Sequence, residues 1–149
     1  MDTRWFGSRG RRRRNVEPQA LHAHHVDFLV AVEQQHAAPY SDHGVALAAD
    51  CDWFVVRKAP KDRGTRQQIE GGVLGAGTRV LMVEDTITTG GSTLTALEVV
   101  RATGAEVVLV TALVDRGDTA APAFAAAGVT YSPLLTWRDV GIDPVVPPA

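Results

Sequence analysis

Residues 80–92 read VLMVEDTITTGGS, and this stretch decides the class of fold. An apolar run typical of a buried strand is followed by two acidic residues, then by hydroxyl side chains and two glycines. Residues 93–103 carry apolar side chains at helical spacing, and Gly104 follows as a stop signal. The stretch therefore predicts a strand over residues 79–83 that ends at the acidic pair, then a tight loop and a helix.

Further elements follow on either side of this unit. Apolar runs at residues 53–57, 106–114 and 129–135 are typical of strands. Residues 119–127 are alanine-rich and helical in pattern, and residues 44–49 suit the end of a helix. Strands that alternate with helices predict an α/β fold, a parallel twisted sheet flanked by helices with a Rossmann-like core. The loops after its strands then meet at one sheet edge, where such sheets bind ligands.

The length and composition of the chain limit the classes of protein to which it can belong. The chain has 149 residues, 45% of them hydrophobic, and a net charge of −2, which suits one domain with no strong polyelectrolyte character. The single cysteine, Cys51, cannot form an internal disulfide, which favours a reducing compartment. No apolar run approaches the roughly 18 residues that span a membrane, and no secretory signal pattern is present. We therefore expect a cytoplasmic protein without a membrane partner.

The beginning of the chain differs from the remainder. Residues 1–20 are polar and basic, with an arginine run at residues 9–14 that we interpret as a solvated tail and not a nucleic-acid site. Residues 21–38 fit a helical face loosely, and the five histidines lack a metal-ligand pattern. We expect residues 1–40 to be an atypical, disordered arm and residues 41–149 to be the core.

The chemistry of the opening stretch points to a phosphorylated sugar. Glycines that expose backbone N–H groups, hydroxyl side chains and the start of a helix together form a cradle for a phosphate monoester. The acidic pair, Glu84 and Asp85, would repel a phosphate bound alone but would accept hydrogen bonds from a sugar diol. Neither the GxxxxGK[ST] nor the GxGxxG pattern of common nucleotide sites is present. One ligand that carries both a phosphate and a polyol satisfies both halves of the motif.

The sequence VEDTITTGGS resembles the motif with which type I phosphoribosyltransferases bind phosphoribosyl diphosphate (PRPP). The resemblance implies that the acidic pair holds the ribose 2- and 3-hydroxyls and that the loop holds the 5-phosphate. It assigns PRPP binding to Glu84, Asp85, Thr86, Ile87, Thr88, Thr89, Gly90, Gly91 and Ser92.

Two flanking segments resemble the orotate branch of this family. Residues 54–64, FVVRKAPKDRG, resemble the strand and mobile basic loop with the motif R-K-x-x-K-x-H-G, and residues 69–71 match the far end of that loop. Residues 113–116, LVDR, resemble the strand end whose arginine holds the orotate carboxylate. The resemblance adds Arg57, Lys58, Lys61 and Arg63 to the PRPP site, makes Lys61 and Asp85 catalytic, and assigns orotate to Thr88 and Arg116.

The resemblance implies an enzyme of de novo pyrimidine (UMP) biosynthesis. Such an enzyme converts orotate and PRPP into orotidine 5′-monophosphate and diphosphate. Mg²⁺ would be carried by PRPP without direct protein ligands, because this ion typically takes substrate oxygens and few protein ligands. Lid residues of this family reach into the neighbouring subunit's site, so a homodimer is expected.

Two departures leave alternatives open. Arg63 stands where the lid motif has histidine, so it retains positive charge but cannot relay a proton near neutrality. The N-terminal hood of the family is not recognisable in residues 1–43, so we expect an incomplete hood. The alternatives are a phosphoribosyltransferase for another base, a PRPP-binding regulator or inactive truncated paralogue, and a generic Rossmann-like nucleotide binder.

Overall fold

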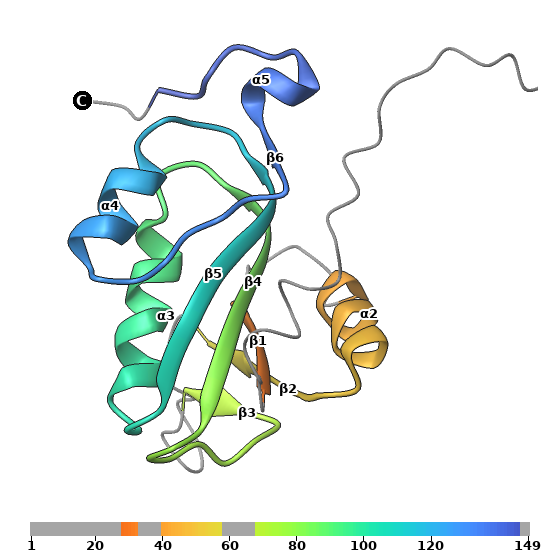
Figure 1. Ribbon diagram of the computed structural model, residues 1–149, viewed down its shortest axis with the longest axis vertical. Helices are drawn as coiled ribbons and strands as arrows, with labels where there is room; N and C mark the ends of the chain where they lie inside the picture. The colour runs from red at the N-terminus through yellow and green to blue at the C-terminus, as the bar shows by residue number, and fades with distance from the viewer. Residues whose placement is uncertain (1–27, 33–39, 58–67, 147–149) are drawn as a thin grey trace, which may run out of the picture.

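The computed structural model describes residues 28–32, 40–57 and 68–146 (Figure 1). Within these residues the chain forms one six-stranded sheet with the strand order β3-β2-β1-β4-β5-β6. All neighbouring strands pair in parallel except β2 and β3, which are antiparallel. The strands are β1 (Phe28–Val32), β2 (Asp52–Val56), β3 (Ile69–Glu70), β4 (Arg79–Ile87), β5 (Glu106–Asp115) and β6 (Leu135–Thr136).

Helices cover both faces of the sheet, as the sequence predicts for an α/β fold (Figure 1). On β4, Val80 and Met82 face the larger apolar core, while Leu81 and Val83 face the smaller one on the α2 side. This alternation buries both faces of the strand, which explains its continuous apolar sequence. The helices are α2 (Tyr40–Ala49), α3 (Gly91–Arg101), α4 (Ala120–Ala126) and α5 (Trp137–Val140).

Strand β1 corrects the expected helical face over residues 21–38. Its sequence FLVAV pairs with β2 on one side and β4 on the other, with Phe28 opposite both Asp52 and Val80. The periodicity of a short apolar run fits a buried strand and a buried helix equally well. Here the run forms a strand because it pairs in parallel with β2 and β4. The sheet thus includes residues that precede the expected start of the core at residue 41. The division of the chain into an arm and a core stays a prediction.

Strand β4 is longer than expected, because it continues through the acidic pair to Ile87. Its neighbour β5 runs equally far, and the register pairs Thr86 with Val114 and Ile87 with Asp115. The expectation that the strand ends at Val83 is therefore wrong. Beyond Val83, the backbone N–H and C=O groups of β4 still form hydrogen bonds with β5. Polar side chains alone therefore do not end the strand.

The last strand is shorter than the predicted span of residues 129–135. Strand β6 comprises two residues, and an isolated bridge joins Val110 to Tyr131. Pro133 lies between these two contacts and has no N–H to donate to the ladder. Proline thus divides a run that its apolar residues would otherwise make continuous.

The other predicted elements agree with the structure to within a few residues. Gly104 after α3 and Gly128 after α4 have positive φ angles of 88° and 66°, as expected of glycines that end helices. No helix within the described parts of the chain is long and apolar enough to cross a membrane.

Candidate functional site

A polar pocket lies at the carboxyl ends of β4 and β5, beside the first turn of α3. Its volume is about 210 Å³. Open α/β sheets bind ligands at this edge, so the pocket lies where the order of elements predicted it. The pocket is lined by Thr86, Ile87, Thr88, Thr89, Gly90, Ser92, Thr93 and Arg116.

The loop before α3 is shaped by Gly90. This residue has φ 79° and ψ 2°, a left-handed conformation that side chains disfavour, and its carbonyl accepts a 2.8 Å hydrogen bond from the Leu94 N–H. A Cβ atom at Gly90 would lie 2.9 Å from Cζ of Phe124. No acidic residue lies in the first turn of α3, so the partial positive charge of this helix start is not offset there. The loop can therefore hold an anion.

The two acidic residues do not lie side by side. Consecutive residues of a strand point to opposite faces, and Glu84 shares the α3 face with Met82. The Glu84 side chain is 3% exposed, and its Oε1 accepts a 2.7 Å hydrogen bond from Thr93 Oγ1. Asp85 is partly exposed, and its Oδ1 accepts a 2.6 Å hydrogen bond from the Thr86 N–H.

The two carboxylates therefore differ in how accessible they are to a ligand, because Glu84 is buried and Asp85 is partly exposed. Neither Glu84 nor Asp85 lines the pocket. The buried Glu84 side chain ties the start of α3 to β4 in this arrangement, and its contact with ribose stays a prediction. Asp85 stays partly open at the strand end, and its contact with ribose stays a prediction. Thr93 was missed because nothing in its local pattern distinguishes it from an ordinary helix residue.

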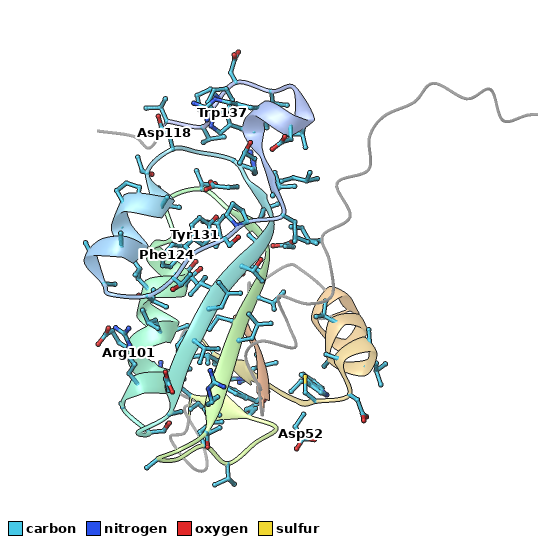
Figure 2. The ribbon with its side chains drawn as sticks, in the orientation of Figure 1. Asp52, Arg101, Asp118, Phe124, Tyr131 and Trp137 are labelled. Carbon is cyan, nitrogen blue, oxygen red and sulfur yellow. The ribbon has the colours of Figure 1, made fainter. Side chains whose placement is uncertain are left out.

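Behind the pocket, Tyr131, Asp115 and Glu84 form a cluster of polar side chains. The Tyr131 hydroxyl is buried and interacts with the Asp115 side chain, and its ring lies 4.7 Å from that of Phe124, centroid to centroid (Figure 2). Burial, followed by the negative charges of Asp115 and Glu84, raises the pKa of Tyr131 above its ordinary value. Asp115 is itself 5% exposed, and its Oδ1 accepts a 3.1 Å hydrogen bond from the Gly117 N–H.

Replacing Tyr131 by phenylalanine should reduce the loss of stability at alkaline pH. Because the pKa of Tyr131 is raised by folding, its contribution is complete below about pH 10, the ordinary pKa, and is lost as pH rises toward the folded value. The free energy of unfolding, measured in urea between about pH 8 and 11, should fall less steeply for Tyr131→Phe than for the wild type. Near pH 7 we expect a small loss of about 0.5–1.5 kcal/mol, the usual net contribution of one hydrogen bond, because the substitution removes the interaction with Asp115. Identical pH slopes for the two proteins would contradict the prediction.

Arg116 is held through its backbone at the end of β5. Its N–H donates a 2.7 Å hydrogen bond to the Ile87 carbonyl, and its own carbonyl accepts one of 2.7 Å from the Val145 N–H. Thr88 lines the same pocket as Arg116. The structure thus brings together the two residues that the sequence assigned to orotate.

Of the four basic residues expected to form the lid, Arg57 alone lies within the described part of the chain. Arg57 follows β2, donates its N–H to the Gln68 carbonyl at 2.8 Å, and pairs with Glu70 through Nε at 3.3 Å. It does not line the pocket. Lys58, Lys61 and Arg63 lie outside the described residues.

The curated proteins described below that are similar in sequence to this chain share one name. No protein-family model matches the chain. An orotate phosphoribosyltransferase from Rhodopirellula baltica is 48% identical over 95 residues, which cover 64% of this chain and 49% of the relative. One from Streptomyces avermitilis is 47% identical over 115 residues, which cover 76% of this chain and 59% of the relative. The chain thus spans between about half and three-fifths of the length of these curated relatives.

A solved structure extends the similarity over more of the chain. The orotate phosphoribosyltransferase of Mycobacterium tuberculosis, in complex with PRPP, is 35% identical with a TM-score of 0.67. The match covers 84% of this chain and 71% of that one. Similarity in sequence and in fold therefore point to the same family.

Proposed function

Because the chain belongs to the orotate phosphoribosyltransferase family, we propose that it binds PRPP at the pocket beside α3 and transfers the phosphoribosyl group to orotate. The products are orotidine 5′-monophosphate and diphosphate. The observation that carries the proposal is the pocket itself, which combines an anion-binding loop from one strand end with Arg116 from the next. A ligand with a phosphate at one end and a carboxylate at the other suits such a site.

In this proposal the residues act chiefly by position and charge. The loop of residues 86–92 binds the 5-phosphate through hydroxyls, backbone N–H groups and the helix start. The Asp85 carboxylate accepts hydrogen bonds from ribose and stabilises the positive charge that develops at the anomeric carbon. Arg116 pairs with the orotate carboxylate, and Thr88 orients the base.

The basic loop completes the proposed reaction. As the bond between the anomeric carbon and the diphosphate breaks, a ring nitrogen of orotate bonds to that carbon and loses its proton to the solvent, and negative charge grows on the diphosphate. Lysine and arginine side chains stabilise charge of this kind as it develops. We assign this role to Arg57, Lys58, Lys61 and Arg63, with Lys61 as the catalytic member.

Mg²⁺, a second subunit and a cytoplasmic location belong to the same proposal. Mg²⁺ prefers oxygen ligands, and the described residues contain no cluster of three or more His, Cys, Asp or Glu side chains. In the proposal PRPP carries the ion, without a direct protein ligand. When bound, it neutralises charge on the diphosphate. The homodimer and the role in pyrimidine biosynthesis follow from the family.

An assay with several bases tests the proposal directly. The purified chain, PRPP and Mg²⁺ are incubated with orotate, uracil or adenine, and nucleotide products are separated by chromatography. We expect orotidine 5′-monophosphate and little or no product from the other bases. Calorimetry with PRPP is run in parallel. Binding of PRPP without any product would favour a regulator, and product from adenine alone would favour a transferase for another base.

Replacing Arg116 by alanine should weaken orotate binding selectively. Loss of a hydrogen bond between charged groups costs about 1.5–3 kcal/mol, so KM for orotate should rise about tenfold to 100-fold. The Kd for PRPP should stay unchanged. Arg116→Lys should recover part of the loss, because it keeps the charge but not the planar, bidentate geometry. Equal losses for orotate and PRPP would contradict the assignment of Arg116.

A further inference from the structure

The segment after α5 contacts the backbone of Arg116. We propose that residues 143–146 position this arginine, with Val145 as the positioning residue, and that they thereby set the preference for an acceptor that bears a carboxylate. The inference deepens the proposed function and rests on it. Figure 1 shows the segment returning from α5 across the loop that joins β5 to α4.

Hydrogen bonds fix the peptide groups on both sides of the Arg116 Cα atom. The Arg116 N–H is bound to the Ile87 carbonyl of β4, and the Arg116 carbonyl is bound by the Val145 N–H, each at 2.7 Å. The first bond belongs to the strand pair, while the second depends on the C-terminal segment. Together they set the direction of the Cα–Cβ bond, along which the side chain leaves the backbone.

The Arg116 side chain has no partner of its own among the described residues. It is exposed, and within those residues its guanidinium makes no hydrogen bond or ion pair. A long side chain without side-chain contacts is positioned chiefly by its backbone. The bond from Val145 thus acts on the part of the arginine that the fold fixes, which is the direction of its Cα–Cβ bond.

Gly117 shows how closely the three segments meet. A Cβ atom at this position would lie 2.6 Å from the Thr88 carbonyl oxygen and 3.4 Å from the Val145 carbonyl oxygen. The loop carrying Thr88, the end of β5 and the C-terminal segment are therefore in contact at one point. A shift of residues 143–146 changes the surroundings of both residues assigned to orotate.

Val145→Pro tests the inference, because proline at this position has no N–H to donate to the Arg116 carbonyl. The measured quantity is the ratio of two dissociation constants, for uridine 5′-monophosphate and for orotidine 5′-monophosphate, which differ by the carboxylate alone. We expect the wild type to bind the carboxylated nucleotide at least about tenfold more tightly. In Val145→Pro the ratio should fall at least about threefold, with the Kd for PRPP changed by less than about twofold.

Val145→Ala is the matched control, since it shortens the side chain and retains the N–H. It should keep the wild-type ratio. A wild-type ratio of one would contradict the proposed function, whereas a wild-type preference that survives in Val145→Pro would overturn this inference alone. Parallel loss of PRPP and of both nucleotides in Val145→Pro would also overturn it, because that result indicates a general structural role.

Discussion

Replacing Asp85 by asparagine should lower kcat/KM for the transfer to orotate by about 10²- to 10³-fold, the usual effect of losing one group that stabilises transition-state charge. The exchange keeps an oxygen at the position that accepts the 2.6 Å hydrogen bond from the Thr86 N–H, so the strand end should stay in place. What it removes is the negative charge that we propose to lie beside the anomeric carbon. Steady-state kinetics measure the loss, and thermal unfolding should show a midpoint close to that of the wild type.

Glu98→Gln offers a matched control for this experiment. It makes the same chemical change on α3, at a side chain that is 73% exposed and pairs with Arg101 at 3.8 Å. A surface ion pair of this kind contributes at most about 1 kcal/mol, so activity should stay within about twofold of wild type. Near-normal turnover in Asp85→Asn, or an equal loss in Glu98→Gln, would remove Asp85 from the proposed mechanism.

Gly90→Ala should destabilise the fold and weaken PRPP binding together. A left-handed conformation costs a residue with a side chain about 1–2 kcal/mol. The added Cβ would lie 2.9 Å from the fully buried Phe124 ring, and such overpacking costs about 1–3 kcal/mol more. We therefore expect a loss of about 2–5 kcal/mol in the free energy of unfolding, measured in urea. Calorimetry should show a higher Kd for PRPP, because the displaced loop no longer directs its N–H groups at the phosphate.

The adjacent Gly91 provides the control for stability. A Cβ there would have Thr89 Oγ1 as its nearest neighbour at 3.7 Å, an ordinary contact, and the residue begins α3. Alanine favours a helix over glycine by up to about 1 kcal/mol, so Gly91→Ala should be as stable as the wild type or more so. Equal destabilisation by the two substitutions would show that neither the φ angle nor the Phe124 contact matters.

The motif at residues 80–92 could be interpreted from sequence because its information is local. Apolar strand, glycines and helix start are neighbours in the chain, and the pocket forms around them. Strand β1 could not be recognised in the same way. FLVAV is too short to separate a strand from a helix by period, and its two parallel partners lie far along the chain.

Features that depend on contacts between distant segments were also missed. Glu84 turns inward because β4 continues past it and Thr93 donates a hydrogen bond to its carboxylate. The bond from Val145 to Arg116 joins the C-terminal segment to β5, and no local pattern indicates it. The sequence thus predicted the loop and the strand ends that line the pocket, while the direction of each side chain depended on the register of β4 and β5.

In the proposed complex, the pairing of Ile87 with Asp115 would limit the length of ligand that fits between the loop and Arg116. The loop that follows β4 and Arg116 after β5 are attached to adjacent strands, whose separation is set by backbone hydrogen bonds at about 4.8 Å. Rotation of side chains does not change this separation between the two strands. A homologue of PRPP with one extra methylene between C5 and its phosphate should therefore be a poor donor, even though it carries every group that we propose the pocket to bind.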